Sequence, residues 1–451
     1  MNPDLFATAL ARSVPRYTSY PTAPQFGPIV SPQTYTSWLN GLLPRERASV
    51  YLHIPYCQQL CWYCGCHTRV ASGKDTLRRY CDALVAEIGL VADAIGNHRH
   101  PVARVHWGGG TPTALDPNDL RRIHRVLTGS FDIAAEAEIA VEIDPRTLSQ
   151  PMVDVLTEIG TSRVSFGVQD FDPAVQAAIN RFQPFDMTQR AVNWLRNAGV
   201  TSINLDLVYG LPLQTEESIR QTVGLVLALA PDRIALFGYA HVPWLKRHQS
   251  LIKESELPGP AARWRQAQTA AEALIGAGYL QIGIDHFARP EDRLAAAATE
   301  GRLHRNFQGY TDDESDCLIG LGASAISSFP AGYAQNAADV PQWLSAIESG
   351  SLATARGTCV SDDDRLRRAI IERLMCDLRV DLRDVARPAA PVGPLLAEAT
   401  PSLKQLERLG IIALSGPVIQ VTPEARPLAR VVAATFDAYL AAGTGRHSAA
   451  V

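Results

Sequence analysis

The sequence predicts an α/β protein. Its main domain is a partial or nearly closed (β/α) barrel, with an extended N-terminal arm and a mainly helical, winged-helix-like C-terminal domain. The first observation is that short β-branched or aromatic runs alternate with helical stretches between residues 48 and 284. Such alternation produces a parallel sheet with right-handed crossovers. The second is the length of 451 residues, which accommodates a barrel of roughly 250 residues with smaller attachments.

The arm covers residues 1–40. This stretch is rich in Pro, Thr, Ser and Tyr, as in residues 15–22 (PRYTSYPT). A residue that precedes proline avoids the helical region of the backbone. We therefore expect an extended segment that lies over another part of the chain, above the active site.

The barrel domain covers residues 41–350. In its clearest helix, apolar residues recur at steps of three and four, which places Leu77, Leu84 and Ile95 on one face. Stretches of the same helical type separate the strands. The predicted strands are 50–54, 102–107, 139–143, 164–168, 203–209, 234–239 and 280–284, and the other predicted helices are 187–197, 215–230 and 261–277.

The C-terminal domain covers residues 351–451. Ser361 and Asp364 have the spacing of a capping box and predict the start of a helix. A second helix, a hairpin at 411–422 and a last helix at 428–440 follow, in an order that resembles a winged-helix module. The segment has no basic face, so we predict a structural cap or lid rather than a DNA-binding domain.

The composition excludes several classes of protein. With 42 basic and 46 acidic residues the formal charge is −4, which argues against a nucleic-acid binder. The apolar run 223–230 is far shorter than the ~20 residues of a membrane span, and residues 1–16 have no apolar segment of the secretory type. We expect a cytoplasmic monomer whose eight cysteines form no disulfides.

Four cysteines lie directly after the first predicted strand. Cys57, Cys61 and Cys64 are separated by three and then two residues, so one loop can wrap around three corners of an iron–sulfur cube and leave one iron open. The spacing is too crowded for a zinc ribbon. Cys66 follows Cys64 too closely to reach the same cluster comfortably. We expect three metal ligands, with Cys66 a nearby non-ligand and a candidate catalytic residue.

This Cys-x-x-x-Cys-x-x-Cys pattern at the end of a first barrel strand resembles the signature of the radical S-adenosylmethionine (SAM) enzymes. The resemblance implies a [4Fe–4S] cluster whose open iron is bound by the amino and carboxylate groups of SAM. It also implies that one electron cleaves SAM to methionine and a 5′-deoxyadenosyl radical.

Further motifs resemble the oxygen-independent coproporphyrinogen III oxidases over nearly the whole chain. This implies that two propionate side chains of coproporphyrinogen III are oxidatively decarboxylated to vinyl groups, giving protoporphyrinogen IX in haem biosynthesis. The sequence does not identify the electron donor, for which a flavodoxin or ferredoxin is a candidate. The motifs are residues 15–22, 64–66 (CGC), 106–113 (HWGGGTPT), 167–171 (GVQDF), 209–212 (YGLP), 285–288 (DHFA), 304–310 (HRNFQGY) and 333–336 (YAQN).

A glycine run and a carboxylate are candidates for the cluster-bound SAM. Consecutive glycines let a backbone approach a ligand closely, whereas a plain turn seldom needs three. The resemblance assigns Gly109 to this SAM and places Gly110 and Thr111 between it and a second SAM. Glu142 ends the third strand and can bind ribose hydroxyls or pair with an arginine such as Arg146. The resemblance favours SAM for Glu142, together with Tyr51 near the cysteine loop.

Residues at the ends of the fourth and fifth strands are candidates for a second SAM. A glutamine, a cation and an anion can together bind an amino acid head group and a ribose, although each alone would be an ordinary surface or ion-pair residue. The resemblance assigns Gln169, Arg181 and Asp206 to this SAM. Tyr63 stands where the family leads us to expect phenylalanine. The resemblance adds further contacts from Tyr63, Ala240 and Ile326.

Substrate carboxylates should meet arginines, and the candidates are Arg16, Arg289 and Arg305. Each is weak, because only four of the 42 basic residues are lysines. Three alternatives stay open. A haem-binding chaperone of the same family typically lacks the cysteine matching Cys66 and the arm at 16–21. A radical SAM enzyme acting on another carboxylate is the second alternative. A simple electron carrier would leave the glycine run unexplained.

Overall fold

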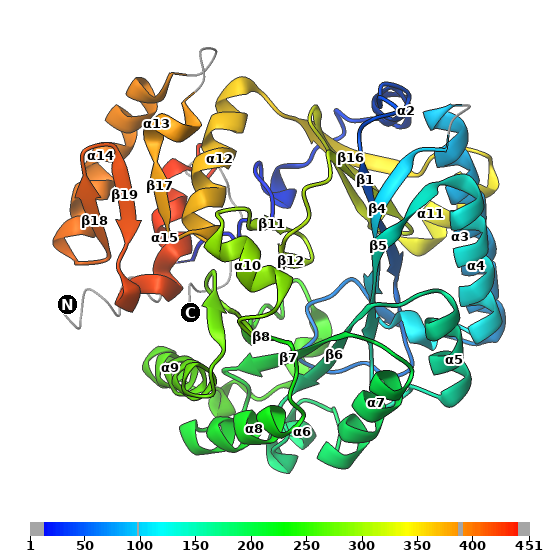
Figure 1. The fold of residues 1–451 in the computed structure, drawn as a ribbon, viewed down its shortest axis with the longest axis horizontal. Coiled ribbons are helices and arrows are strands. Elements are labelled where there is room, and N and C mark those ends of the chain that lie inside the picture. The colour runs from blue at the N-terminus through cyan, green and yellow to red at the C-terminus, as the bar shows by residue number, and fades with distance from the viewer. Residues whose placement is uncertain (1–12, 97–98, 387–390, 441–451) are drawn as a thin grey trace. The chain divides into compact units, whose positions relative to one another are not determined.

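The computed structural model describes residues 13–96, 99–386 and 391–440, and it confirms the α/β class (Figure 1). The described chain forms two compact units. The cysteine-loop unit contains Phe26–Asp206 and Ser315–Cys359. The C-terminal unit contains the described parts of Met1–Gln25, Leu207–Glu314 and Val360–Val451. The division into 1–40, 41–350 and 351–451 stays a prediction.

The cysteine-loop unit is built on parallel strands. β1 pairs with β4 on one side and with β13 on the other, and both pairs are parallel. Along β1 the side chains of Val50, Leu52 and Ile54 are buried, and the alternating positions Tyr51 and His53 face the other way. The strand order is β16-β15-β14-β13-β1-β4-β5-β6-β7. The bounds are β1 (Ala48–Ile54), β4 (Pro101–Gly109), β5 (Asp132–Ile143), β6 (Arg163–Gln169), β7 (Ser202–Tyr209), β13 (Cys317–Leu321), β14 (Ile326–Phe329), β15 (Gly332–Asn336) and β16 (Thr354–Cys359).

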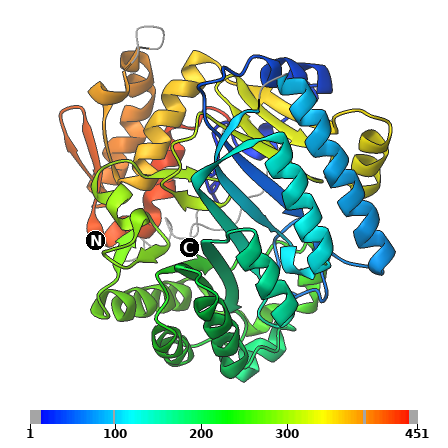
Figure 2. The ribbon, with the colours of Figure 1, turned by 45° about the vertical axis from the view of Figure 1, so that its right-hand side comes forward.

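Helices cover one face of these strands, and α3 and α4 lie side by side over them (Figure 2). The face predicted for the helix that begins near Leu77 is confirmed, because Leu84, Ile88 and Ile95 are buried. The helices are α2 (Pro32–Asn40), α3 (Lys74–Ile95), α4 (Pro117–Ser130), α5 (Gln150–Glu158), α6 (Pro173–Ala178), α7 (Phe185–Asn197) and α11 (Val340–Glu348).

The C-terminal unit contains the last residues of β7, from Leu207 onward. In the order of the sheet, β7 is followed by β8, β10 and β9. A separate three-stranded sheet, β17-β19-β18, packs against helices α12 and α14, and α15 packs against α12 (Figure 1). The elements are α8 (Glu216–Ala228), β8 (Arg233–Gly238), α9 (Pro260–Gly276), β9 (Leu280–Ile282), β10 (His286–Ala288), α10 (Arg293–Thr299), β11 (His304–Asn306), β12 (Gly309–Thr311), α12 (Asp362–Cys376), β17 (Arg379–Asp381), α13 (Leu382–Val385), α14 (Val392–Arg408), β18 (Ile412–Ser415), β19 (Val418–Val421) and α15 (Ala429–Ala433).

The predicted capping box is confirmed at the start of α12. The Ser361 hydroxyl accepts a hydrogen bond from the Asp364 backbone at 3.1 Å, and the Asp364 carboxylate accepts one from the Ser361 backbone at 3.0 Å. The predicted hairpin is also present, as the antiparallel pair β18 and β19. Within the described residues, no helix combines the length and the apolar character that crossing a membrane requires.

Two expectations are wrong. Within the arm, Pro32–Asn40 forms helix α2, because the Ser31 hydroxyl caps it by accepting from the Thr34 backbone at 3.2 Å and proline fits its first turn. The last helix is only Ala429–Ala433, and Ala434–Phe436 continues it as a tighter 3-10 turn. Residues 1–12 of the arm lie outside the described residues.

We expect Glu87→Ala to destabilise the protein. The buried Glu87 carboxylate accepts hydrogen bonds from Gly322, Asn336 and Trp343, and its removal leaves buried donors without an acceptor. The free energy of unfolding should fall by roughly 3 kcal/mol, as measured by urea titration. Glu348→Ala is the control, because Glu348 pairs with Arg79 at the surface and should matter far less. Equal losses in both variants would contradict this account.

Candidate active site

The cysteine loop leaves the sheet directly after β1. It begins in β2 (Tyr56–Cys57), which pairs with β3 (Arg69–Val70) at the far end of the loop. Between these short strands the loop is attached to the turn after α6. The Trp62 backbone N–H donates to the Ile179 carbonyl at 3.0 Å, and the Asn180 side chain donates to the Leu60 carbonyl at 3.0 Å. The loop and this turn therefore form one local structure.

The four thiols have different surroundings. Cys61 is buried, Cys57 and Cys64 are partly buried, and Cys66 is exposed. Cys57 accepts a hydrogen bond from the Thr111 hydroxyl, with 3.4 Å between oxygen and sulfur. Burial raises the pKa of the Cys57 thiol, and hydrogen bonding by Thr111 opposes this. A hydrogen bond with Cys64 raises the pKa of Cys66, which places Cys66 beside the predicted ligands.

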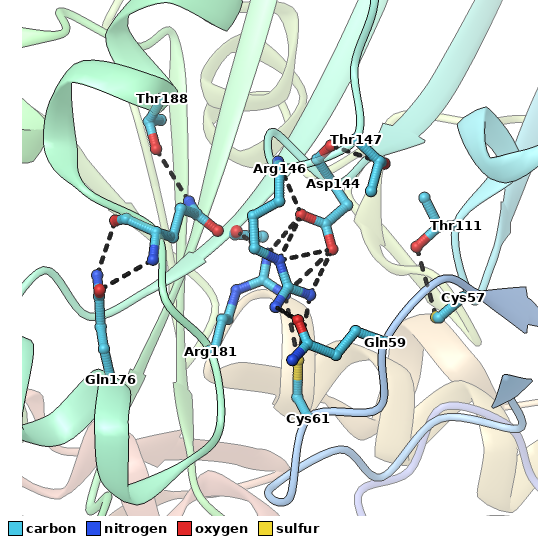
Figure 3. Close-up of polar contacts among 12 residues, drawn as sticks. Cys57, Gln59, Cys61, Thr111, Asp144, Arg146, Thr147, Gln176, Arg181 and Thr188 are labelled. Atoms are coloured by element: carbon cyan, nitrogen blue, oxygen red, sulfur yellow. Dashed lines mark hydrogen bonds and ion pairs between the residues drawn. The ribbon is translucent and has the colours of Figure 1, made fainter.

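A buried ion network surrounds the Cys61 sulfur (Figure 3). The Asp144 carboxylate binds Arg146 at 2.6 Å and Arg181 at 3.5 Å. Each of these guanidinium groups also donates to the Cys61 sulfur, at 3.4 Å. All three charged side chains are at most 10% exposed. Together they place two guanidinium donors and a net positive charge around this sulfur.

The pKa values in this network reflect mutual stabilisation. Burial alone would raise the pKa of Asp144, but Arg181 and Arg146 bring it below its ordinary value. Burial likewise opposes the charge of Arg181, yet Tyr63, Asp144 and Cys61 raise its pKa. Arg181 is further oriented by donating to the Gly167 carbonyl at 2.5 Å. The network therefore stays charged at neutral pH.

A second cluster joins β1, β4 and β5. Tyr51 lies opposite His106 in the β1–β4 register, and its hydroxyl hydrogen-bonds His53 Nδ1 at 3.0 Å. His106 contacts Glu142 at 3.1 Å, and the other Glu142 oxygen accepts from the Gly109 backbone at 3.0 Å. Burial alone would raise the pKa of Glu142, but these hydrogen bonds bring it below the ordinary value. Glu142 is therefore a carboxylate.

The glycine run makes room for this cluster. A Cβ on Gly108 would lie 2.7 Å from the Glu142 carboxylate, and one on Gly109 would lie 2.6 Å from the His53 ring. Gly109 also has φ +112°, which favours glycine. A Cβ on Gly110 would lie 2.7 Å from the Tyr56 carbonyl. The glycines are thus required by close internal packing.

A third polar group lies on β6 and β7, with Asp206 and Asn204 on β7 and Ser165 on β6. The Asp206 carboxylate accepts hydrogen bonds from Ser165 at 3.0 Å and from Asn204 at 2.7 Å. Gln169, the last residue of β6, has φ +69°, a conformation that is uncommon for a residue with a side chain. Such strain is often found at functional sites.

The other candidates are less closely joined. Burial raises the pKa of Tyr63, and the charge of Arg181 opposes this, so the ring lies near the ion network. Ile326 begins β14 in the cysteine-loop unit, and its backbone lies against Gly320, the residue opposite Tyr51 in the β1–β13 register. Ala240 follows β8 and belongs to the C-terminal unit. Arg146 pairs with Asp144 rather than with Glu142, which was the alternative considered from the sequence.

Sequence reasoning missed several members of these clusters. Asp144 follows directly after β5, at a strand end where barrel proteins place working residues, and this was an available signal. His53 and His106 lie on the same face of the sheet as Tyr51. The alternation of residues along β1 places His53 on this face, and the pairing of β1 with β4 places His106 there. Ser165 and Asn204 gave no signal beyond their strand positions.

Comparison with known proteins identifies the family. Residues 51–226 match the Radical SAM superfamily, and residues 360–428 match the HemN C-terminal domain. An oxygen-independent coproporphyrinogen III oxidase from Bradyrhizobium diazoefficiens is 48% identical and covers 100% of both chains. This chain belongs to the oxygen-independent coproporphyrinogen III oxidase family.

Two other members of the family show the same extent of similarity. The oxidase from Paracoccus denitrificans is 44% identical, covering 97% of this chain and 96% of its own. The solved structure of coproporphyrinogen III oxidase (HemN) from Escherichia coli, a radical SAM enzyme, has a TM-score of 0.90 and 38% identity. It covers 95% of this chain and 100% of its own. The predicted fold and family are confirmed.

The residues present fit the [4Fe–4S] cluster that the radical SAM family implies. One loop supplies Cys57, Cys61 and Cys64, and two guanidinium groups already donate to one of these sulfurs. Hydrogen bonds to cysteine sulfur are a usual feature of such sites. Across the described residues, no three His, Cys, Asp or Glu side chains are already arranged as a metal site. The three-thiolate ligand set stays a prediction.

We expect His53 to make stability depend on pH. Burial lowers the pKa of His53 to about 4, whereas the unfolded chain binds this proton below about pH 6.5. The unfolded state therefore takes up a proton first as the pH falls. From about pH 7 to about pH 5, the wild type should lose roughly 2 kcal/mol more unfolding free energy than His53→Gln.

Urea titrations of both proteins across this range measure the difference. His53→Gln is the reference for the wild type, because the two proteins share every other titrating group. Parallel stability curves for the two proteins would show that His53 is not held neutral by burial.

Proposed function

We propose that this protein converts coproporphyrinogen III to protoporphyrinogen IX without O2. The observation that carries the proposal is the similarity, along the whole chain, to relatives named oxygen-independent coproporphyrinogen III oxidases. In this reaction each of two propionates loses one hydrogen atom, one electron and CO2 as it becomes a vinyl group. When bound, the cluster and SAM supply the 5′-deoxyadenosyl radical that removes the hydrogen atom.

We assign Cys57, Cys61 and Cys64 as the cluster ligands. The ion network supports this assignment for Cys61, because Arg146 and Arg181 stabilise negative charge on its sulfur. The Thr111 hydroxyl does the same for Cys57. The Cys66 thiol lies beside Cys64, and we propose that it acts near the cluster without binding iron.

We assign the cluster formed by β1, β4 and β5 to the first SAM. Glu142 is held as a carboxylate by His106 and Gly109, and a carboxylate can accept hydrogen bonds from both ribose hydroxyls. The close packing of Gly109 and Gly110 fixes the backbone beside it. Tyr51 extends the same surface through its hydrogen bond to His53. These residues would orient SAM for the reaction.

We assign a second SAM to a group centred on Asp206 and Gln169. Asp206 is oriented by Ser165 and Asn204, and Gln169 has a strained backbone. Arg181 supplies a cation that can bind a carboxylate. Two SAM molecules suit a reaction that oxidises two propionates. The further residues assigned to this second site or its border are Tyr63, Gly110, Thr111, Ala240 and Ile326.

Partners and compartment follow from the same proposal. A one-electron donor of the flavodoxin or ferredoxin class would reduce the cluster, and we propose a monomeric enzyme in the cytoplasm. The eight cysteines all lie among the described residues and form no disulfide there, which supports a reducing compartment.

The decisive experiment is anaerobic reconstitution with iron, sulfide, SAM and a reductant, followed by addition of coproporphyrinogen III. Wild-type protein and Cys66→Ser should each contain four iron atoms per chain, as a [4Fe–4S] cluster requires. Cys57→Ser, Cys61→Ser and Cys64→Ser should lose most of this iron and all vinyl product. Cys359→Ser is the matched control, because this exposed thiol lies on β16.

The outcomes separate the alternative functions. Vinyl product with 5′-deoxyadenosine supports the oxidase. SAM cleavage without vinyl formation would indicate another carboxylate substrate. Tight haem binding without either product would favour a chaperone, and a stable reduced cluster that never cleaves SAM would favour an electron carrier.

We expect reconstituted protein to bind about two SAM molecules per chain in anaerobic equilibrium dialysis. Asp206→Asn should bind about one, because the second site loses its anion while the Glu142 cluster is intact. Asp154→Asn is the control, because Asp154 lies on α5 and its carboxylate accepts an exposed hydrogen bond from Gln150 of the same helix. A single bound SAM in the wild type would contradict the second site.

A further inference from the structure

In the C-terminal unit, the side chain of Arg263 lies against the residues that follow β7 and β8, and its hydrogen bonding is incomplete. Arg263 of α9 donates to the Tyr239 carbonyl at 2.7 Å, and its buried Nε has no hydrogen-bond partner among the described residues. A Cβ on Gly210 would lie 2.9 Å from this Nε. The guanidinium therefore lies against a glycine after β7, where larger residues would displace it.

A second arginine of this kind comes from the β11–β12 hairpin. The Arg305 side chain is only 6% exposed, and its nearest acidic oxygen, on Asp285, is 3.9 Å from Nη1. Its buried Nε and Nη1 have no hydrogen-bond acceptor in the described part of the chain. The guanidinium lies over the Tyr310 ring, 4.5 Å from its centre. Asp285 already binds His286 at 2.7 Å.

Two further arginines complete the group. Arg16 donates to the Gly238 carbonyl at 3.4 Å, at the end of β8. Arg430 of α15 is 7% exposed. Burial, together with the charges of Arg16 and Arg305, lowers the pKa of Arg430 to about 10, against the opposing charge of Asp285. Arg430 therefore lies close to both of these guanidinium groups.

Within the described residues, Arg263 and Arg305 each have buried N–H groups without a hydrogen-bond acceptor. The pKa of the neighbouring Asp285 carboxylate is lowered by His286, Arg305 and Arg16 against its burial. Burying a charged N–H group without a hydrogen-bond acceptor is costly. The N–H groups of Arg263 and Arg305 that have no acceptor therefore indicate an anionic ligand.

We propose that Arg16, Arg263, Arg305 and Arg430, termed here the arginine group, form a subsite for propionate carboxylates of the porphyrinogen. The proposal rests on the proposed function and adds to it. Two of the four propionates are not oxidised, so they can be held by permanent ion pairs through the reaction. Arg305 Nε and Nη1 offer two N–H groups without acceptors, which suits bidentate binding of one carboxylate.

The structure separates Arg289 from this subsite. Arg16 and Arg305 were candidates from the sequence and belong to the arginine group, together with Arg263 and Arg430. Arg289 instead donates to the Pro231 carbonyl at 3.0 Å, before β8 begins, and its side chain lies over the Tyr279 ring. It is therefore at the opposite end of β8 from Gly238.

The test uses full-length reconstituted protein with coproporphyrin III, the stable aromatic form that has the same four propionates, as the binding probe. Arg305→Gln and Arg263→Gln should each weaken binding about tenfold or more, because each removes a charged hydrogen-bond donor. Arg305→Lys should recover part of the loss. The KM for coproporphyrinogen III should rise in the same order.

Matched controls come from the same elements. Arg265→Gln lies on α9 with Arg263 and pairs with Glu216 at the surface. Arg302→Gln lies near β11 and pairs with Glu300 and Glu314. Both should bind the probe like the wild type. Iron content, SAM binding and circular dichroism should be unchanged in all variants, which separates loss of the subsite from loss of the fold.

The outcomes distinguish this inference from the function on which it rests. If the wild type forms vinyl product and correctly folded Arg305→Gln and Arg263→Gln bind the probe as tightly as it does, the subsite is refuted and the function stands. If the wild type binds the probe through these arginines but forms no vinyl product, the subsite stands and the function is refuted.

Discussion

The structure of the candidate site depends on one buried carboxylate. Asp144 binds two guanidinium groups, and both of these donate to the sulfur of Cys61. In the absence of Asp144 the positive charges of Arg146 and Arg181 would repel each other at short range. The carboxylate therefore allows two buried cations to support a cysteine on a loop that has little regular structure of its own. Gln176 and Gln183 hold the turn that carries Arg181 by reciprocal hydrogen bonds.

The same principle, polar groups fixed by rigid strands, applies to the neighbouring cluster. Glu142 obtains its hydrogen bonds from a histidine on β4 and from the backbone of Gly109. His53 is neutral because burial lowers its pKa, so its Nε2–H can donate to the His67 carbonyl while Nδ1 accepts from Tyr51. The glycines next to these rings leave no space for a Cβ. Cofactor binding would then require little rearrangement of these side chains.

Local patterns in the sequence were sufficient for strands β1 and β4–β9, for the helix at α3 and for the capping box at Ser361, because each depends on neighbours along the chain. They did not predict strands β13–β16, which continue the sheet beyond β1. The cysteine loop was recognisable for the same reason. The role of Asp144 was not recognisable from the sequence, because its partner Arg181 is distant along the chain. The two side chains meet only when β5 and the turn after α6 come together. The helix α2 had a local signal in Ser31 and Pro32, but the proline-rich composition of the arm outweighed it. The lack of acceptors for the N–H groups of Arg263 and Arg305 within the described residues is visible only in three dimensions.

The most direct test of this account is the iron content of Asp144→Asn after anaerobic reconstitution, compared with the wild type. Asparagine keeps the size of the side chain but removes the charge that holds Arg146 and Arg181 together. The account expects a folded protein that retains much less iron and loses it faster on dilution. An Asp144→Asn protein with the iron content and cluster lifetime of the wild type would contradict the claim that this carboxylate organises the site.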